Sequence, residues 1–586
     1  MKYLVAFLSL LAVGYLAFLS VYTSAFSAYQ VEPSVHPVLQ MKGKHAEEAR
    51  LIKIGDRIHQ AFAYDFSNIF FIEGDKGIIV IDSGWSAKAT ERALQDYRTI
   101  TTKPIVALIY THGHSDHLGG ARILVDENPD VPVKIYAADS WHKQYAHFNT
   151  ALAPHVTMRA AAQLGALLPD GNHGRVNIGV GKMQLKNNIS VDFVAPTEEI
   201  SELSNITIEG VRLQLIPMAS ETIDQMLIWL PEDKVMHAAD VAASAVPILS
   251  TPRNEPDRSP IGFIDSIELM MDRPVEHLIA GHSLPVLGKD KAREALLVQR
   301  DAAQFIYDQT IRALNNNLGP RETAETVQLP DHLANHPILS QTYHRVPWLV
   351  RGLYSRYGGW FSGDTADLNP LSKHEEAKRM IVLAGGAEAF LEHTENAFHQ
   401  GDYQWAAQLA SYLLDAKVEE KTAKAIKIAA LKGMAYASYS GNQRHYMLTE
   451  ALTMELGVNP NKARQLPKDV APLKLLSMKT LLRLMGPNLN PDACPEKTTT
   501  LAIHMKNRSE KPNEVHFISL RRSVFHYHKN PVEEPDTQIE TERETLEHIL
   551  ANQLSWKDAV NEGKINVIGD TSDLGAFLEC FDFYEL

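Results

Sequence analysis

Thr111-His112-Gly113-His114-Ser115-Asp116-His117-Leu118-Gly119-Gly120 is the most informative segment of the chain. Residues 103–110, directly before it, read Lys-Pro-Ile-Val-Ala-Leu-Ile-Tyr, an apolar and β-branched run that predicts a buried strand. After it, Gly119-Gly120 and the run 121–124 predict a turn that opens a helix. Three imidazoles and a carboxylate are therefore predicted at the end of a core strand, where ligands commonly bind.

These four side chains have the chemistry and spacing of metal ligands. His112 and His114 are two residues apart, so in an extended chain their side chains point the same way. Asp116 and His117 come just past the bend and can face a second centre. Imidazole and carboxylate suit zinc, and also iron or manganese. Surface histidines in a polar turn would explain one histidine better than this cluster, and we predict a two-metal site.

Length, charge and cysteine content narrow the class of protein. A chain of 586 residues is too long for one hydrophobic core and predicts about three or four domains. The net charge of −14 argues against a nucleic-acid partner. The only cysteines, Cys494 and Cys580, exclude a disulfide scaffold and a cysteine-zinc protein. The two thiols either pair in an oxidising compartment or stay buried and unpaired.

The N-terminus predicts export. Residues 1–28 begin with Lys2 and an apolar run to about Tyr22, and Ala25-Phe26-Ser27 is a candidate cleavage site. The run approaches the roughly 20 residues that span a bilayer, so an uncleaved membrane anchor is an alternative to a signal peptide. In both cases the catalytic part is exported, to the periplasm or beyond. Residues 29–50 are polar, contain proline, show no periodicity and predict an extended arm.

Three more candidate ligands follow predicted strands further along the chain. Glu221 lies in a turn between the strands predicted at 211–216 and 226–230. Asp240 ends the strand predicted in 234–241 and could bridge two metals, and His282 ends another. Each could be an ordinary turn residue. All three at strand ends favour one shared site.

The motif His112-x-His114-x-Asp116-His117 resembles the signature of the metallo-β-lactamase superfamily. The strands predicted at 67–74 and 77–84, joined by a turn at Asp75-Lys76 and ending near Asp82, resemble its upstream hallmark. The resemblance implies an α/β fold, the αβ/βα sandwich, with two mixed sheets face to face and helices outside. It places the catalytic domain at 51–300. It implies two zinc ions per chain, held by His112, His114, Glu221, Asp116, His117, Asp240 and His282.

Several passages resemble one branch of that superfamily, the exported bacterial alkylsulfatases. Glu221 stands where other branches usually supply a histidine, and residues 195–200, 206–211, 350–363 and 401–407 are similar to passages of this branch. The resemblance implies hydrolysis of alkyl sulfate esters to alcohol and sulfate by a metal-activated hydroxide. Arg253 aligns with a family arginine that we expect to bind sulfate through its planar guanidinium. The alternative is a solvent-facing side chain, which is common for an arginine in a Pro-rich loop.

The same resemblance assigns the remaining parts of the chain. Asp240 and Arg253 are the expected catalytic residues, and Tyr354 and Tyr357 in the passage 350–363 are expected to bind substrate. Residues 301–460 have helical periodicity and would form a dimerisation domain of a homodimer; a helical cap within a monomer is the alternative. Residues 470–586 resemble an α+β sterol-carrier-like domain with an apolar tunnel, and a packed domain without a ligand is the alternative.

The chain also departs from the alkylsulfatase pattern. That family has a second Glu near Gln225, Glu at Asp240 and Asn at Val241, and residues 242–247 lack its Thr- and His-rich run. Metal binding survives these changes, because Asp serves as well as Glu for bridging; the property on which they bear is specificity for sulfate esters. Two other functions therefore stay open: a di-metal hydrolase of another ester, lactone, phosphoester or β-lactam, and a non-catalytic exported binding protein for apolar molecules.

Overall fold

The structure is a computed structural model, and it describes most of the chain after residue 28. The described residues are 29–45, 48–148, 151–181, 192–242, 244–253, 255–458, 468, 470–494, 496–506, 514–530, 534–584 and 586. The predicted signal or anchor therefore lies outside the described residues. Among those residues, no helix combines the length and apolar character needed to cross a membrane.

The described chain divides into two compact units. The larger unit contains the described residues up to Gln144 and from Arg159 to Val458. It holds two β-sheets and most of the helices. The smaller unit contains the C-terminal sheet, together with Tyr145–Met158.

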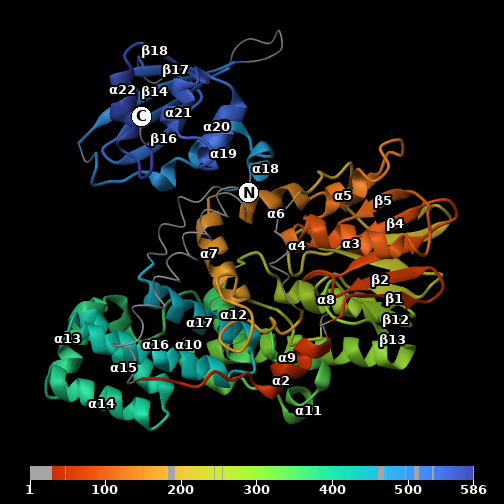
Figure 1. Ribbon diagram of the computed structural model, residues 1–586, viewed down its shortest axis with the longest axis horizontal. Helices are drawn as coiled ribbons and strands as arrows, with labels where there is room; N and C mark the ends of the chain where they lie inside the picture. The colour runs from red at the N-terminus through yellow and green to blue at the C-terminus, as the bar shows by residue number, and fades with distance from the viewer. Residues whose placement is uncertain are drawn as a thin grey trace. The chain divides into compact units, whose positions relative to one another are not determined.

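The larger unit contains two mixed sheets, whose labelled strands lie at the right of Figure 1. The first has strands in chain order; β1 to β4 are antiparallel neighbours, and β4 to β7 are parallel neighbours. Its strands are β1 (Arg50–Ile54), β2 (Ile58–Phe62), β3 (Ile69–Glu73), β4 (Ile78–Ile81), β5 (Ile105–Ile109), β6 (Lys134–Ala138) and β7 (Glu198–Ile200). The second sheet, in the order β13-β12-β11-β10-β9-β8, has one parallel pair, β11 with β12. Its strands are β8 (Ser204–Ile208), β9 (Val211–Pro217), β10 (Met226–Leu230), β11 (Val235–His237), β12 (His277–Ile279) and β13 (Val286–Leu287).

The two sheets pack face to face and share one apolar core. Side chains of the first sheet, such as Phe70 and Ile79, meet side chains of the second, such as Leu215 and Ile228. Burial of such β-branched and aliphatic runs on both sheets is the main force that holds the layers together. Helix α3 (Ala87–Tyr97) covers the outer face of the first sheet, where Tyr97 stacks on Phe71 with ring centroids 4.2 Å apart (Figure 1). The predicted αβ/βα sandwich is confirmed.

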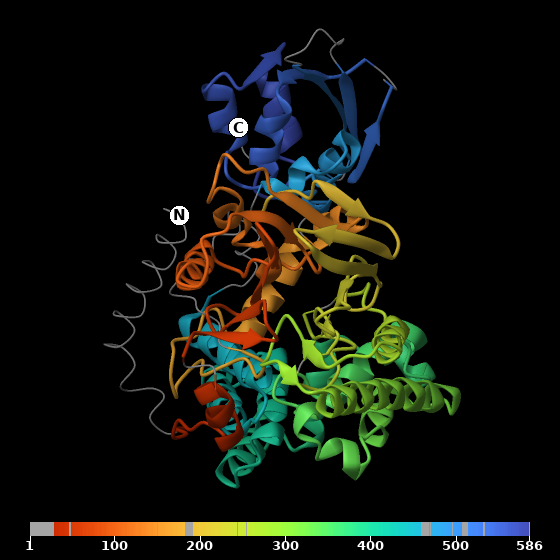
Figure 2. The ribbon, with the colours of Figure 1, turned by 90° about the vertical axis from the view of Figure 1, so that its right-hand side faces the viewer.

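Helices α8 (Pro260–Met271) and α9 (Lys289–Asn315) cover the outer face of the second sheet. Helix α9 is the long yellow-green helix of Figure 2, and its buried Ala295, Leu296 and Ala303 pack in the same cluster as the outer side chains of β9–β12. The predicted boundary between residues 300 and 301 falls inside this helix. Side chains of this helix as far as Tyr307 join the cluster on the second sheet, and the domain boundary stays a prediction.

The predicted extended arm is partly wrong, since Pro37–His45 form helix α2. Leu39 is fully buried, and its carbonyl accepts a hydrogen bond from Nδ2 of Asn177 at 2.5 Å. Arg444, far along the chain, donates from Nη1 to the carbonyl of Ser34 at 2.8 Å. Packing against the rest of the larger unit therefore stabilises this helix, which the mixed polar sequence of the arm does not predict.

The region between α9 and residue 458 is helical, as predicted. Its helices are α10 (Pro320–Thr326), α11 (Asp331–Ala334), α12 (Val346–Gly358), α13 (Lys373–Leu383), α14 (Ala387–His399), α15 (Tyr403–Ala416), α16 (Glu420–Ala437) and α17 (Gly441–Leu456). Helices α13 to α16 share a core of small, aliphatic and aromatic side chains, including Ala430, Leu409 and Phe390. Asp402 ends the loop after Gly401 and caps α15 by accepting a bond from the amide of Trp405.

The smaller unit is an α+β domain. Its sheet has the order β16-β15-β14-β17-β18, with β14 and β17 parallel. The strands are β14 (Thr498–Met505), β15 (Val515–Arg521), β16 (Val524–His528), β17 (Thr537–Thr541) and β18 (Ile565–Ile568), and the helices include α20 (Arg543–Leu550), α21 (Trp556–Asn561) and α22 (Thr571–Leu578). Cys494 and Cys580 form a disulfide, which settles the alternative left open by the sequence. The sterol-carrier-like tunnel stays a prediction.

Candidate metal centre

The motif 111–120 leaves the first sheet at the end of β5 and turns into two short helices, α4 (Ser115–Leu118) and α5 (Ala121–Val125). The two glycines of the motif lie against the segment that follows β4. A β-carbon on Gly119 would overlap the carbonyl of Trp85, and one on Gly120 would overlap the side chain of Thr90. The Gly-Gly pair therefore lets the motif pack closely on the end of the neighbouring strand.

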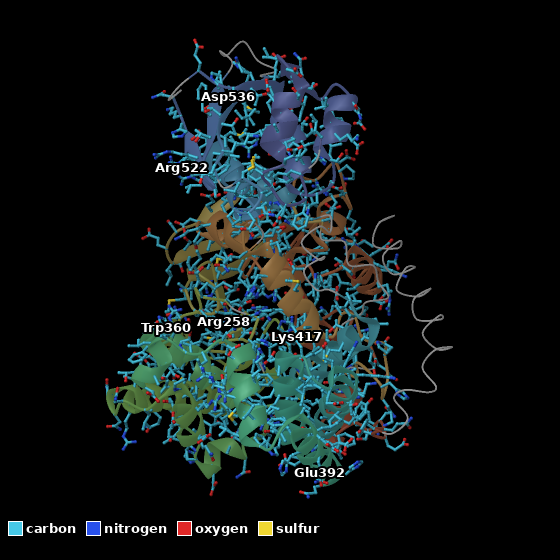
Figure 3. The ribbon with its side chains drawn as sticks, turned by 90° about the vertical axis from the view of Figure 1, so that its left-hand side faces the viewer. Arg258, Trp360, Glu392, Lys417, Arg522 and Asp536 are labelled. Atoms are coloured by element: carbon cyan, nitrogen blue, oxygen red, sulfur yellow. A yellow bond between two sulfur atoms is a disulfide. The ribbon has the colours of Figure 1, made fainter. Side chains whose placement is uncertain are left out.

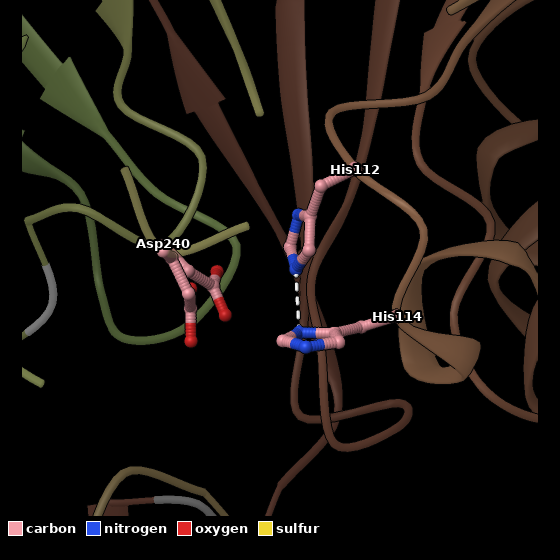
Figure 4. A group of neighbouring side chains, drawn as sticks. His112, His114 and Asp240 are labelled. Carbon is pink, nitrogen blue, oxygen red and sulfur yellow. Dashed lines mark hydrogen bonds between the residues drawn. The ribbon is translucent and has the colours of Figure 1, made fainter. Parts of the chain in front are cut away.

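The candidate ligands form two groups. His112, His114, Glu221 and Asp240 make up the first, and Asp116, His117 and His282 the second; within each group the potential ligand atoms lie within 4.8 Å of one another. In the first group, Nε2 of His112 and Nδ1 of His114 face each other at 2.8 Å, and Asp240 lies to one side of the two rings (Figure 4). The structure thus brings together all seven residues that the sequence singles out as ligands.

Asp240 connects the two groups. Its Oδ2 lies 3.1 Å from Nε2 of His282 and 3.6 Å from Nε2 of His117. Asp116 approaches the same two imidazoles, with Oδ2 at 3.3 Å from His282 and 3.4 Å from His117. Asp240, a member of the first group, therefore also contacts imidazoles of the second group.

Hydrogen bonds behind the rings fix the orientation of three of these histidines. Nδ1 of His117 lies 2.7 Å from Oδ2 of Asp82, and Nδ1 of His282 donates to the carbonyl of Phe66 at 3.1 Å. Nδ1 of His112 lies 3.0 Å from Oγ1 of Thr111, which donates to Oδ2 of Asp82 at 2.8 Å. These bonds turn Nε2 of each ring toward the site, as outer partners of metal-binding histidines do.

His114 is oriented by a residue that the sequence analysis missed. Oε1 of Glu255 lies 3.3 Å from Nε2 of His114, so Nδ1 of this ring faces the site. Glu255 also accepts bonds from Nε and Nη2 of Arg253 at 2.7 and 2.5 Å. Its other oxygen accepts from Nε of Arg258 at 2.5 Å. Glu255 therefore joins a ligand of the first group to two arginines.

Arg258 was also missed, and it holds Glu221. Nη2 of this arginine lies 2.6 Å from Oε1 of Glu221, and Nη1 donates to the carbonyl of Ile248 at 2.7 Å. The side chain of Arg258 is only 2% exposed, and it lies inside the unit (Figure 3). Residues 249–253 and 255–258 lie in irregular structure, so no periodicity marks these two positions. Two prolines and four charged residues in ten positions were the available signal.

The carboxylates and imidazoles of the second group shift one another's pKa values. Burial alone would lower the pKa of His282, but Asp240 and Asp116 outweigh it and raise that pKa to about 10. In the same way, Asp116 and Asp240 hold the pKa of His117 well above its usual value despite burial. Burial, together with the charges of His117 and His114, keeps the pKa of His112 well below its usual value. The site thus carries concentrated negative charge facing ring nitrogens, which suits a cation.

The donor set fits divalent metal ions. Oε2 of Glu221 and Oδ1 of Asp240 are buried, and neither forms a hydrogen bond with any described residue. Buried carboxylate oxygens without partners are costly unless a cation occupies the adjacent space. Four imidazoles and three carboxylates in two adjoining groups are a ligand set for borderline metals such as zinc.

Backbone strain surrounds this site. Asp82, Ala239 and Ser283 have φ values of 57°, 47° and 85°, in the left-handed region that residues with a β-carbon rarely adopt. Asp82 supports His117, Ala239 precedes Asp240, and Ser283 follows His282. Such conformations persist where the surrounding structure imposes them, and they are typical of functional sites.

Arg253 lies beside the first group, whereas the two predicted tyrosines have partners elsewhere. The hydroxyl of Tyr354 donates to the carbonyl of Phe361 at 3.1 Å, and the ring of Tyr357, 42% exposed, packs on Tyr307. Helix α12, which carries both tyrosines, does contact the arginine loop: a β-carbon on Gly352 would overlap Oγ of Ser250. The substrate-binding role of the tyrosines stays a prediction.

The fold and the ligand set define a metal-dependent hydrolase of the metallo-β-lactamase superfamily, whose family model matches residues 64–282. Residues 319–457 match the alkyl sulfatase dimerisation model, and residues 469–585 match the alkyl sulfatase C-terminal model. The chain belongs to the alkylsulfatase family.

Individual relatives support this assignment over nearly the full chain. A linear primary-alkylsulfatase of Pseudomonas sp. (strain ATCC 19151) is 30% identical over 519 residues, which are 87% of this chain and 98% of that protein. An (R)-specific secondary-alkylsulfatase of Pseudomonas sp. is 30% identical over 563 residues, 94% of this chain and 83% of that protein. The solved structure of the stereoselective inverting sec-alkylsulfatase Pisa1 from Pseudomonas sp. superimposes with a TM-score of 0.80 at 28% identity, over 96% of this chain and 89% of that one.

Proposed function

We propose that this protein hydrolyses alkyl sulfate esters to an alcohol and inorganic sulfate at a site that holds two zinc ions. The observation that carries the proposal is the link from Arg253 through Glu255 to His114, which holds a guanidinium beside the first ligand group. A guanidinium presents paired N–H donors that match two oxygens of a sulfate group. The relatives named as alkylsulfatases support the same substrate class.

The roles of the residues follow from their positions. His112, His114 and Glu221 would hold one ion, Asp116, His117 and His282 the other, and Asp240 would bridge them. Hydroxide at neutral pH is the chemistry that two such bound ions supply. Beyond its bonds to Glu255 and Tyr343, Arg253 keeps one hydrogen on Nη1 and one on Nη2, and these would bind the sulfate oxygens.

An apolar cluster beside the ligands supports an alkyl substrate. Phe66, Leu164, Ile178, Ala245, Ile248 and Tyr343 pack together, with Trp85 and Val180 partly exposed against them. The ring of Phe66 lies 4.3 Å from that of His282, measured between centroids. Apolar surface next to the ligands would stabilise a hydrocarbon chain while the sulfate end faces Arg253.

We infer two further properties of the whole protein. Homodimer formation through the helical region is supported by the match to the dimerisation model and by the exposed Val382 and Leu383 on α13. Export is supported by the apolar N-terminal sequence and by the disulfide between Cys494 and Cys580, since disulfides persist in oxidising compartments. Cell fractionation with N-terminal sequencing of the mature protein tests export; protein found in the cytosol with free thiols would contradict it.

The function is tested by sulfate release from dodecyl sulfate. Purified zinc-loaded protein is expected to release sulfate and to contain about two metal ions per chain by elemental analysis. His114→Ala, which removes a ligand of the first group, is expected to reduce release to background. Two bound metals without sulfate release would contradict the proposal and would redirect the search to other esters and lactones.

A further inference from the structure

We propose that Tyr343 binds the same substrate anion as Arg253: it holds the guanidinium in place and donates its own hydroxyl hydrogen to the anion. Tyr343 is buried in the loop before helix α12, outside the predicted site residues. The inference rests on the proposed function for the identity of the anion, a sulfate group. Its geometry rests on the hydrogen bonds around the phenol oxygen.

Two nitrogens donate to the phenol oxygen of Tyr343. Nη1 of Arg253 lies 3.2 Å from it, and Nε2 of Gln163 lies 3.3 Å from it. A guanidinium carries only donors, so in the first contact the tyrosine must accept. The phenol oxygen therefore fixes one edge of the Arg253 fork, while Glu255 fixes the other.

The second contact also requires the tyrosine to accept. Gln163, which is fully buried near the end of α7 (Ala153–Leu164), receives two hydroxyl donors at its amide oxygen. Thr251 donates to Oε1 at 3.0 Å, and Tyr446 donates to it at 3.2 Å. These bonds turn the amide nitrogen of Gln163 toward Tyr343, so that this nitrogen donates.

Because both lone pairs of the phenol oxygen accept hydrogen bonds, Tyr343 can form a further bond only as a donor, through its hydroxyl hydrogen. Among the residues that the structure describes, no group accepts that hydrogen. Burial raises the pKa of Tyr343, although Arg253 opposes the shift, so the phenol keeps its proton at neutral pH. A buried donor of this kind costs free energy unless an acceptor arrives, and a sulfate oxygen on Arg253 is such an acceptor.

A separate observation places Tyr343 next to the ligands. Its ring belongs to the apolar cluster of Phe66 and Ile248, and Phe66 packs directly on His282. The same side chain thus borders the apolar surface on one side and the arginine on the other. Tyr343 therefore stands where the polar head of an alkyl ester meets its hydrocarbon chain.

The bonds behind Tyr343 reach into the helical region. Tyr446 lies on α17, and the adjacent His445 donates from Nδ1 to the main-chain carbonyl of Gln163 at 3.1 Å. Among the described residues, no hydrogen bond joins Gln163 or Tyr446 to the ligands or to Arg253, and both are positioning residues for Tyr343. We expect their removal to weaken anion binding less than removal of the Tyr343 hydroxyl itself.

The test measures sulfate binding by calorimetry on the zinc-loaded, full-length protein, alongside the KM and kcat for dodecyl sulfate. Tyr343→Phe should weaken sulfate binding about tenfold, since hydrogen bonds to charged groups are of that strength. It should raise KM more than it lowers kcat and leave zinc content unchanged. Gln163→Leu should show a smaller effect in the same direction, and it provides a second reading if Tyr343→Phe folds poorly.

Tyr64→Phe is the matched control, because Tyr64 is also a buried tyrosine with a bonded hydroxyl, whose partner is Asp96. It should bind sulfate as the wild type does. Wild-type-like sulfate binding by both Tyr343→Phe and Gln163→Leu, or no sulfate binding by the wild type, would overturn the inference. Sulfate binding that weakens in Tyr343→Phe without any ester turnover by the wild type would support the inference and contradict only the proposed function.

Discussion

Gly281 lies directly against Asp240: a β-carbon on this glycine would overlap Oδ1 of the aspartate and would lie 2.6 Å from Cε1 of His117. The amide of Gly281 also donates to the carbonyl of Ala239 at 2.8 Å, which ties the segment before His282 to the segment before Asp240. Asp240, His117 and His282 thus converge because the residue between them has no side chain.

Gly281→Ala should disrupt the metal centre without removing a ligand. Overpacking of this kind costs about 1–3 kcal/mol, which predicts a loss of metal affinity of about ten- to a hundredfold. Competition with a zinc-binding dye measures that affinity. Gly575→Ala is the control, because a β-carbon there meets its nearest neighbour at 3.6 Å, and its zinc affinity should equal that of the wild type.

Asp82→Asn should weaken metal binding through His117. The carboxylate that accepts from Nδ1 of His117 and from Thr111 would become an amide, and the ring would lose its fixed tautomer. Losing such an outer partner typically costs about 10–100-fold in metal affinity. Zinc titration followed by elemental analysis checks the change, and Asp233→Asn, which alters a surface ion pair with Arg57, serves as control. Equal affinity in both variants would contradict the orienting role.

Acid should destabilise the larger unit through His445. Burial lowers the pKa of this histidine to about 3, with added effects from the charges of Arg175 and Arg444, whereas the unfolded chain has a histidine pKa of about 6.5. Between these values the unfolded state binds a proton that the folded state does not. The free energy of unfolding should therefore fall as the pH drops below about 6.5, by about 1.4 kcal/mol per pH unit from this group.

Urea unfolding at pH 7.5 and pH 5 measures that loss. His445→Asn keeps a donor for the carbonyl of Gln163 but cannot be protonated, so its unfolding free energy should depend less on pH than that of the wild type. Identical pH dependence in the two proteins would show that His445 is not the group that titrates.

Charges at the end of α13 should convert the expected homodimer to a monomer. Val382 and Leu383 are 75% and 82% exposed, and such apolar side chains favour a partner surface. Trp360, 74% exposed, lies on the same helical region of the chain (Figure 3). Light scattering should give twice the chain mass for the wild type and the chain mass for Val382→Glu/Leu383→Glu. Leu203→Glu, which charges an exposed leucine in the catalytic region, should remain dimeric.

Much of the catalytic fold could be predicted from local sequence. The strands that became β3, β4, β5, β9 and β10 are short β-branched runs between turn residues, and this pattern depends little on distant parts of the chain. Helix α2 could not be predicted in the same way. Its apolar face amounts to little more than Leu39, which bonds to Asn177, and Arg444 holds Ser34 just before the helix; both partners lie more than a hundred residues away.

The ligand candidates were predictable because each follows a strand, and strand ends meet at one edge of a sheet. Glu255, Arg258 and Tyr343 had no such signal, since they lie in loops whose course is set by α8 and α12. Gln163 carried a weak sequence signal, because it is a polar residue within the apolar run Ala160-Ala161-Ala162-Gln163-Leu164. A buried amide in an apolar helix end generally has a partner, but the partner can be found only in three dimensions.

The disulfide between Cys494 and Cys580 has a consequence for the fate of the C-terminal unit. It joins positions 86 residues apart and encloses all five strands of the sheet in one covalent ring. A protease that cuts a loop inside this ring leaves both fragments attached to the rest of the chain. An exported protein would thereby keep this unit after such a cut. In a chain with free thiols, the same cut would release the fragment after the cleavage site.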